Sequence, residues 1–483
     1  MSAPDTRAPR RRAVLVGVQA PDVPDEAFAA SLDELARLAK TLGLEVVGRV
    51  SQRRARPAPG AVVGEGKLRE LARWTGGTGV VPVGPPVRRR RGRDGGEGEE
   101  RDEETAAAHA AARDREDASG ADDEDAASPA GAAEEGAAPR ARVVLVDAEL
   151  TPSQARNLER ATGAEVLDRT AVILAIFQRH ARTREARLQV EIARLRYVAP
   201  RLRETGVGRD REGGGIGGRG AGESASELDR RKVRDRIAEL RAELAAIERE
   251  AGTRRSRRSE HPTVALVGYT NAGKSSWMRA LTGSGVLVAD ELFATLDTTV
   301  RALRPETVPR ILVSDTVGFI KNLPHDLVAS FRSTLEEARD ADLLVHVVDA
   351  SDPAFPAQVE VTREVLGEIG AAESPRLVVL NKADRLDAAT RERLAREWPE
   401  ALLLSARAPA DVAALRERLV AFFERGAVEA ELSVPWAKQR VVAEAHARAR
   451  VLDARSDAEG THLRLRAQPE VIARLQALLD ARP

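Results

Sequence analysis

The chain has 483 residues, 42% of them hydrophobic. It is too long to fold around a single hydrophobic core, so two to four domains of about 150 residues each are expected. It carries 76 basic and 76 acidic side chains, and this zero net charge gives no global sign of a nucleic-acid partner. The absence of cysteine excludes disulfides, thiolate metal sites and cysteine nucleophiles, and the lack of a signal-peptide core or a membrane-spanning run favours a cytoplasmic protein.

The first predicted domain, residues 1–180, alternates strands with helices. Strands are predicted at residues 11–19 and 44–50, where valine and leucine cluster. Apolar residues recur on one helical face between them: Phe28, Leu32, Leu35 and Leu42. Gly43 follows at the position of a C-terminal helix cap. This order predicts a parallel α/β domain, which a further strand at 141–150 extends.

An insert at residues 84–139 interrupts this domain. It contains almost no large apolar side chains, so burial cannot offset the entropy lost on ordering it, and it is predicted to be disordered. Its run Arg88–Arg91 suggests an RNA contact, but a solvated charge run in a tolerated insertion is the simpler interpretation.

An antiparallel helical hairpin is predicted at residues 181–252. Apolar residues recur at helical spacing in its first half: Leu188, Ile192 and Leu195. A coiled-coil seam follows in its second half: Val233, Ile237, Leu240, Leu244 and Ile247. Pro200 is expected to end the first helix, and residues 253–262 are expected to link the hairpin to the next domain. The glycine-rich loop at 205–227 permits either close approach to a partner or a flexible connection.

A second α/β domain is predicted at residues 263–427, and it opens with the phosphate-loop (P-loop) pattern GxxxxGKS. The loop follows an apolar strand and precedes an amphipathic helix, where backbone N–H groups converge on phosphate oxygens. The candidate nucleotide-binding residues of this loop are Gly268, Tyr269, Thr270, Asn271, Ala272, Gly273, Lys274, Ser275 and Ser276. Lys274 is expected to reach the β- and γ-phosphates, and the Ser275 hydroxyl is expected to bind Mg²⁺.

Three further motifs follow apolar strands in the order that a GTPase requires. They are Asp315, Thr316, Val317 and Gly318; Asn381, Lys382, Ala383 and Asp384; and Ser405, Ala406 and Arg407. Asp315 is expected to hold Mg²⁺ through water, and the Gly318 N–H is expected to sense the γ-phosphate. Asn381 is expected to tie its loop to the P-loop, and Lys382 is expected to lie along the base.

Asp384 selects guanine over adenine in this interpretation. A carboxylate accepts two parallel hydrogen bonds from guanine N1–H and the 2-amino group, whereas adenine has no 2-amino group and an unprotonated N1. A backbone N–H at Ser405 or Ala406 would reach guanine O6. Spacing leaves three candidates open for the switch threonine that completes the Mg²⁺ shell: Thr295, Thr298 and Thr299.

These segments resemble the HflX GTPases of the Obg-related group. The resemblance is carried by “GYTNAGKSS” (268–276), “LFATLDTT” (292–299), the segment from “DTVGFIKNLPHDLV” to “HVVDASDP” (315–353) and “NKAD” (381–384), and upstream by residues 150–202 and 213–231. It implies an α/β amino-terminal domain, a helical hairpin, a Ras-like GTPase (G) domain with a doubly wound, mostly parallel sheet, and a small carboxyl-terminal α/β domain at 430–483.

The resemblance also completes the expected site. It places the switch threonine at Thr295 and adds Phe293 and Ala294 to the nucleotide contacts. The Mg²⁺ ligands would then be Ser275, Thr295 and Asp315. Arg407 stands in “SARAPADVAAL”, which lacks the glycine usual after the guanine-contacting pair.

The resemblance implies a function on the ribosome. HflX proteins bind the large (50S) subunit, where the amino-terminal domain and the glycine-rich loop approach rRNA near the peptidyl-transferase centre. The implied role is ribosome splitting and rescue or subunit assembly, by a monomeric, Mg²⁺-dependent enzyme with GTP and GDP as ligands. The alternative is a GTPase that acts on free rRNA or tRNA in modification or assembly.

Catalysis is expected to rest on Lys274 and Gly318. Many GTPases place a glutamine after this glycine to orient the attacking water, but Phe319 has no hydrogen-bonding group, so slow turnover and stimulation by a partner are expected. Asn271 either helps to hold K⁺, as in related GTPases, or only fits the turn, and both interpretations stay open. The amino-terminal domain offers no second P-loop for ATP, because “GEGK” at 64–67 is too short.

Overall fold

The computed structural model describes residues 11–81, 140–202, 225–258, 261–285, 292–293, 299–321 and 332–480. The predicted insert at 84–139, most of the glycine-rich loop, Ala294 and Thr295 lie outside these residues. The chain divides into two compact units, one up to Ile176 with Arg194–Arg234, the other Phe177–Ala193 with the residues from Asp235 on. None of the described helices is both long and apolar enough to cross a bilayer.

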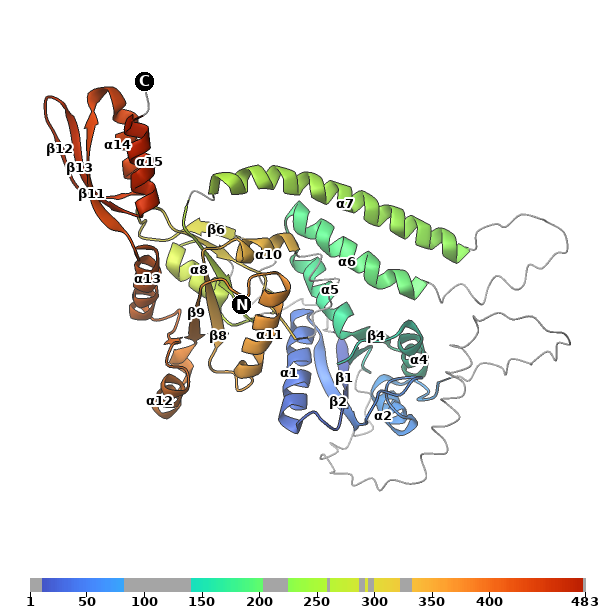
Figure 1. The fold of residues 1–483 in the computed structure, drawn as a ribbon. Coiled ribbons are helices and arrows are strands. Elements are labelled where there is room, and N and C mark those ends of the chain that lie inside the picture. The colour runs from blue at the N-terminus through green and yellow to red at the C-terminus, as the bar shows by residue number, and fades with distance from the viewer. Residues whose placement is uncertain are drawn as a thin grey trace, which may run out of the picture. The chain divides into compact units, whose positions relative to one another are not determined.

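The first unit contains a parallel sheet in the order β2-β1-β3-β4 (Figure 1). Its strands are β1 (Arg12–Gln19), β2 (Glu45–Arg53), β3 (Val143–Val146) and β4 (Glu165–Asp168). Its helices are α1 (Asp25–Thr41), α2 (Glu65–Thr75) and α4 (Pro152–Thr162), and α5 (Arg169–His180) follows β4. The three predicted strands and their parallel arrangement are confirmed.

Local sequence explains where these helices begin and end. Gly43, with φ +78°, follows α1 in the left-handed conformation expected of a C-terminal cap. α4 begins at a capping box, in which the side chains of Thr151 and Gln154 each accept a hydrogen bond from the other residue's backbone N–H. Gly163, with φ +64°, ends this helix. Buried apolar side chains of the strands and helices form one core: Val14, Val16, Val144, Val146, Leu71 and Leu158.

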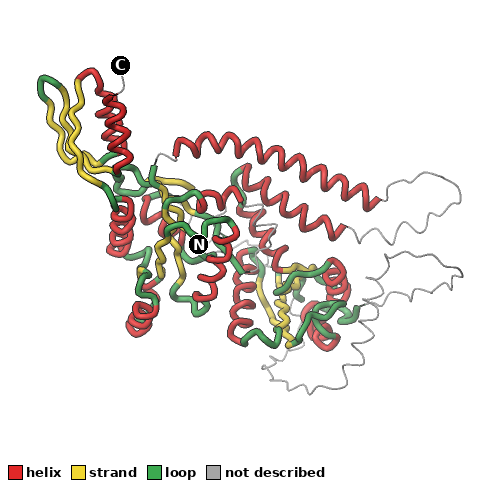
Figure 2. The backbone as a smooth tube through the Cα atoms, in the orientation of Figure 1, coloured by secondary structure: helices red, strands yellow, loops and turns green. Residues whose placement is uncertain are grey.

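Helices α6 (Arg184–Leu202) and α7 (Ala225–Arg258) form the hairpin, which is drawn in red in Figure 2. Arg184 at the start of α6 is ion-paired with Glu243 in the second half of α7, as antiparallel helices require. Three residues of the predicted apolar seams are buried: Leu188, Ile192 and Leu240. The buried positions agree with the predicted apolar seams, and the ion pair joins the two helices.

Three hairpin boundaries predicted from the sequence are wrong. The first helix passes Pro200 and ends at Leu202, the second includes the last residues of the predicted loop 205–227, and it continues through Arg258 of the expected linker. Pro200 removes one helical hydrogen bond, the one to the carbonyl of residue 196, and only Arg201 and Leu202 follow it in the helix. Residues 253–258 contain no glycine or proline, so nothing in that run stops the second helix.

The second unit contains a six-stranded sheet in the order β10-β9-β8-β5-β7-β6. Its strands are β5 (Thr263–Val267), β6 (Thr299–Ala302), β7 (Leu312–Asp315), β8 (Leu343–Asp349), β9 (Arg376–Asn381) and β10 (Leu402–Leu403). All neighbours are parallel except β6 and β7. This is the mostly parallel sheet that was expected.

Helices cover both faces of this sheet. They are α8 (Lys274–Thr282), α10 (Arg332–Arg339), α11 (Phe355–Glu368), α12 (Ala388–Glu397) and α13 (Pro409–Phe423). Side chains alternate along β5, so Val264 and Leu266 join a core with α8 and α13. Ala265 and Val267 join a second core with α10 and α11. Two cores on opposite faces confirm the doubly wound fold.

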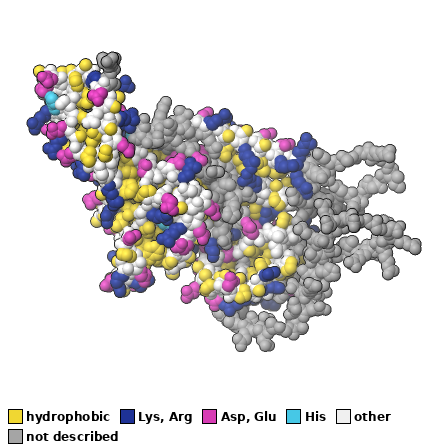
Figure 3. All heavy atoms as spheres, in the orientation of Figure 1, with side chains coloured by type: hydrophobic (Ala, Val, Ile, Leu, Met, Phe, Trp, Pro, Cys, Tyr) yellow, Lys and Arg dark blue, Asp and Glu magenta, His cyan; other side chains and the backbone are white. Residues whose placement is uncertain are grey.

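The carboxyl-terminal part is a small α/β layer. An antiparallel sheet in the order β11-β13-β12 is built from β11 (Val428–Pro435), β12 (Arg450–Ser456) and β13 (Gly460–Ala467). The helices α14 (Gln439–Arg448) and α15 (Pro469–Asp480) share a core with it. Figure 3 shows basic and acidic side chains interspersed over the visible face of the described residues, in keeping with their equal numbers.

Candidate functional site

The loop after β5 has a backbone that admits only glycine at two positions. Gly268 has φ +143°, and a Cβ there would lie 2.1 Å from the carbonyl oxygen of Val347. Gly273 has φ +101°, and a Cβ there would lie 2.2 Å from Nδ2 of Asn381. Both glycines hold the loop against β8 and β9 at the carboxyl edge of the sheet, and α8 begins at Lys274. This strand, loop and helix is the arrangement that a phosphate cradle needs.

Lys274 is the buried cation of the loop. Its ammonium group donates to the carbonyl oxygens of Gly268 at 3.0 Å and Tyr269 at 2.8 Å, and only 6% of the residue is exposed. Burial lowers the pKa of this lysine to about 8, and the charge of Asp315 opposes that shift. Phosphate oxygens would favour the protonated form more strongly than neutral carbonyls do, so the site suits an anionic ligand.

Ser275 and Asp315 pair two hard oxygen ligands beside this cation. The Ser275 hydroxyl donates to Oδ2 of Asp315 at 2.7 Å, and Asp315 is fully buried at the end of β7. Mg²⁺ prefers oxygen ligands of this kind, so the pair fits the predicted metal. When bound, Mg²⁺ would supply positive charge beside the phosphates. The third predicted ligand, Thr295, lies outside the described residues.

Gly318 brings the Asp-x-x-Gly segment into contact with the P-loop. A Cβ there would lie 2.8 Å from Cα of Thr270 and 3.1 Å from Nζ of Lys274, so a larger residue would enter the loop. Two backbone hydrogen bonds fix the register: Thr270 N–H donates to the Phe319 carbonyl at 2.8 Å, and Phe319 N–H donates to the Gly268 carbonyl at 3.1 Å. The Gly318 amide is therefore held beside the lysine.

Asn381 joins the P-loop to the carboxyl end of β10. Its Nδ2 donates to the carbonyl oxygen of Ala272 at 2.7 Å, and its Oδ1 accepts from the Ala406 N–H at 3.2 Å. The residue is 2% exposed. One buried amide thus fixes the spacing between a loop suited to phosphates and a loop suited to a base.

Asp384 is the candidate base-selecting carboxylate. Its Oδ1 accepts from the Ser405 hydroxyl at 2.6 Å, and this hydrogen bond lowers its pKa. A guanidinium nitrogen of Arg407 lies 3.9 Å from Oδ2, and the Arg407 side chain is 77% exposed. Asp384 is therefore ionised at neutral pH and partly open to solvent, as a carboxylate that accepts hydrogen bonds from a ligand must be.

Sequence patterns did not single out two other carboxylates of this region. Lys382, with φ +63°, donates to Oδ2 of Asp349 at 2.6 Å. The Ser405 N–H donates to Oδ2 of Asp411 at 2.8 Å. Asp349 ends β8, and its place at the carboxyl edge of a parallel sheet is a signal that could have found it. Asp411 carries no such signal, because acidic residues are common in the first turn of a helix such as α13.

Of the three contacts predicted at Phe293, Ala294 and Thr295, Phe293 lies among the described residues. It is 3% exposed, and its ring packs edge to face on Phe177 with centroids 4.6 Å apart. Its side chain therefore serves the core, and a nucleotide contact at this position would come from its backbone. The structure thus brings the motifs at residues 268–276, 315–318, 381–384 and 405–407 to one edge of the sheet.

Comparison with known proteins gives three family models that match the chain. They are described as GTP-binding GTPase N-terminal over residues 29–81 and 130–178, GTP-binding GTPase Middle Region over 180–258, and 50S ribosome-binding GTPase over 263–382. The chain is 57% identical over 478 residues to a GTPase HflX of Gluconacetobacter diazotrophicus, covering 99% of this chain and 100% of that one.

Two further proteins show similarity at greater distance. A GTPase HflX of Magnetococcus marinus is 38% identical over 474 residues, with 97% of this chain and 95% of that chain covered. Among solved structures, a GTP-binding protein of the archaeon Sulfolobus solfataricus in complex with GDP is 22% identical. Its TM-score is 0.40, with 85% of this chain and 98% of that chain covered.

Proposed function

The chain belongs to the HflX family of GTPases, and from this membership we propose that its GTP hydrolysis serves an action on the large (50S) ribosomal subunit. The ribosomal partner is supported by the description of the family model that matches residues 263–382. Ribosome splitting or rescue and subunit assembly both agree with such a partner. Action on free rRNA or tRNA is the alternative, and pelleting with intact subunits rather than with naked RNA separates the two.

We propose that GTP binds along the carboxyl edge of β5, β7, β9 and β10. The observation that carries this assignment is the bridge made by Asn381, because it fixes the two loops at one spacing. The P-loop would cradle the phosphates, with Lys274 on the β- and γ-phosphates, and the 381–384 and 405–407 loops would hold guanine. Ser275, Asp315 and Thr295 would hold Mg²⁺, with Phe293 and Ala294 beside the nucleotide.

We expect the chain's own groups to support only slow hydrolysis. Lys274 and the Gly318 N–H would offset the negative charge of the γ-phosphoryl group as it transfers to water. Phe319 is 1% exposed and packs in the core with α10 and β8, so it has neither the chemistry nor the position to hold a water. Asn271 has φ +60°, which asparagine tolerates, so its turn is explained without a ligand, and K⁺ coordination remains a proposal.

GTP affinity is expected to fall as pH rises above about 8. Burial lowers the pKa of Lys274 to about 8 without nucleotide, and the phosphate charges would raise it, so binding above that pH takes up a proton. Affinity is then complete below about pH 8 and decreases by up to about tenfold per pH unit above it. Titration with a fluorescent GTP analogue measures this slope. Lys274→Met is the control, because ionisation of guanine at high pH weakens binding in both proteins. The prediction is wrong if GTP affinity falls with pH no more steeply in wild type than in Lys274→Met.

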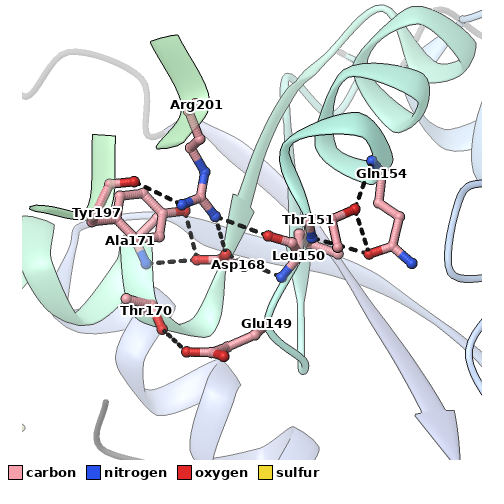
Figure 4. A network of polar contacts seen from close by, with 9 residues as sticks. All are labelled: Glu149, Leu150, Thr151, Gln154, Asp168, Thr170, Ala171, Tyr197 and Arg201. Carbon is pink, nitrogen blue, oxygen red and sulfur yellow. Dashed lines mark hydrogen bonds and ion pairs between the residues drawn. The ribbon is translucent and has the colours of Figure 1, made fainter. Parts of the chain in front are cut away.

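The end of α6 that leads into the glycine-rich loop is anchored in its own unit (Figure 4). Asp168, 2% exposed at the end of β4, accepts from the Tyr197 hydroxyl and from Arg201, both at 2.8 Å. The Arg201 guanidinium also stacks on the Tyr197 ring at 3.5 Å and donates to the carbonyl oxygen of Leu150 at 3.1 Å. Burial and the Asp168 charge raise the pKa of Tyr197, so its hydroxyl keeps its proton. This network fixes the point from which the loop starts.

Ribosome-stimulated turnover is expected to depend on the loop, whereas basal turnover is not. We expect that replacing residues 209–222 with a neutral Gly/Ser linker removes most 50S affinity and most 50S-stimulated hydrolysis. Three arginines would otherwise neutralise rRNA phosphates: Arg209, Arg211 and Arg219. GTP turnover with and without purified 50S subunits, at two salt concentrations, measures the effect.

The matched control replaces residues 105–118, an equal length of the predicted insert, with the same linker. That variant is expected to keep both basal and stimulated rates. If the 209–222 variant is stimulated as strongly as wild type, the loop is only a connection and the ribosomal role proposed for it is wrong. If neither wild type nor control responds to 50S subunits, the ribosomal proposal itself fails.

A further inference from the structure

One buried hydroxyl of the P-loop lacks a hydrogen-bond partner among the described residues. Thr270 is 6% exposed, and its Oγ1 makes no hydrogen bond within the part of the chain that the structure describes. Two other buried threonines of this unit are satisfied: Thr282 donates to the Met278 carbonyl at 2.6 Å, and Thr316 donates to the Leu266 carbonyl at 2.7 Å. An unpaired buried hydroxyl is destabilising, so its presence in a phosphate-binding loop indicates that it forms a hydrogen bond when the nucleotide is bound.

The backbone and the methyl group of Thr270 are placed by rigid neighbours. A Cβ built on Gly318 would lie 2.8 Å from Cα and 2.9 Å from Cγ2 of Thr270, and 3.1 Å from Nζ of Lys274. The Thr270 N–H is held by the Phe319 carbonyl at 2.8 Å. Thr270 therefore stands where the P-loop, the lysine and the Gly318 amide converge, which is the γ-phosphate end of the proposed site.

At the same end of the site, the described residue that follows Gly318 has no group that could orient water. Phe319 occupies the position where many GTPases carry glutamine, and its ring lies in the core with Leu335 and Leu344. Among the described residues of the Asp-x-x-Gly segment, Thr316 also points elsewhere, since its hydroxyl is bound to Leu266. A hydroxyl can both accept a hydrogen bond from water and donate one to a phosphate oxygen.

We propose that the Thr270 hydroxyl orients the attacking water for GTP hydrolysis. The inference rests on the P-loop site proposed above. The water oxygen forms a bond to the γ-phosphorus, and the bond from that phosphorus to the β,γ-bridging oxygen breaks. GDP leaves with the electron pair, and the proton of the water passes to the phosphate product. Thr270 Oγ1 accepts a hydrogen bond from the water and donates one to a γ-phosphate oxygen, so the water lies in line.

The test compares Thr270→Val with Thr270→Ser in the full-length protein. Valine keeps the shape and removes the hydroxyl, and we expect it to lower kcat for GTP about 10- to 100-fold. GDP affinity should stay within about twofold, because GDP has no γ-phosphate and no attacking water. The thermal midpoint should not fall, because the hydroxyl has no hydrogen-bond partner to lose among the described residues. Serine should restore most of kcat.

Thr362→Val is the matched control, because Thr362 is a fully buried threonine of α11 whose hydroxyl donates to the Gln358 carbonyl at 2.9 Å. It should lower the thermal midpoint and leave kcat unchanged. Wild-type kcat in Thr270→Val, or a serine variant as slow as the valine variant, overturns the inference. If Lys274→Ala is inactive in either case, only the inference on Thr270 fails and the proposed P-loop site still stands. If Lys274→Ala is active, the proposed P-loop site is wrong as well.

Discussion

Lys274→Ala protein is expected to hydrolyse GTP about 10³-fold more slowly than wild type and to unfold at nearly the same temperature. The ammonium group is the buried cation of the loop, held by two backbone carbonyls until phosphates replace them. Charge on the transferring phosphoryl group is offset in place by such fixed groups, so alanine removes stabilisation that water cannot restore. The loss should appear in the rate of the chemical step.

The fold should tolerate this change because the two carbonyls keep other donors. The Gly268 carbonyl also accepts from the Phe319 N–H at 3.1 Å, and the Tyr269 carbonyl also accepts from the Ala272 N–H at 3.3 Å. Removing a desolvated cation also removes a cost of folding. Single-turnover hydrolysis and calorimetry measure the two quantities, with Lys67→Ala on α2 as a lysine control in the other unit. Turnover near the wild-type rate would show that the P-loop is not the active site.

The site was more predictable than the hairpin, for a physical reason. A Cβ at Gly268 or Gly273 would lie 2.1 or 2.2 Å from its nearest neighbour, so both positions require glycine. Asn381 is required for the buried hydrogen bond between two loops. The site's chemistry therefore restricts the residue at each of these positions. Helix boundaries are restricted less. Only two residues follow Pro200 in its helix, so the one helical hydrogen bond that it removes lies at the helix end. Residues 253–258 continue the second helix because none of them opposes a helix.

Tertiary contacts account for what the sequence did not show. Phe293 packs on Phe177, which stands 116 positions earlier in the chain (293 − 177), and no local pattern encodes that pairing. The sequence showed only that Phe319 stands where many GTPases have glutamine. Its burial among Leu335, Ala338 and Leu344 shows that its side chain packs in the core. That the Thr270 hydroxyl has no hydrogen-bond partner among the described residues is likewise visible only in three dimensions.

Asp384→Asn is expected to weaken GTP binding by about 10²- to 10⁴-fold, because two hydrogen bonds to a charged acceptor contribute roughly 1.5–3 kcal/mol each. The carboxylate is ionised, since the hydrogen bond from Ser405 lowers its pKa. An asparagine amide offers one acceptor and two donors, so it opposes one of the two guanine donors. Xanthine carries an oxygen at position 2, to which the new amide can donate. Preference should therefore move from GTP to XTP.

Competition binding of GTP and XTP to both proteins measures this change of preference. The matched control is Asp387→Asn, the same substitution three positions along the chain. Asp387 caps α12 by accepting from the Thr390 N–H at 2.7 Å, and asparagine caps equally well, so neither stability nor base preference should change. The Asp384 side chain is 36% exposed, so its substitution should leave the fold intact and confine the effect to the ligand. An Asp384→Asn protein that still prefers GTP would mean that guanine is selected by other groups, with the Ser405 and Ala406 backbone as the remaining candidates.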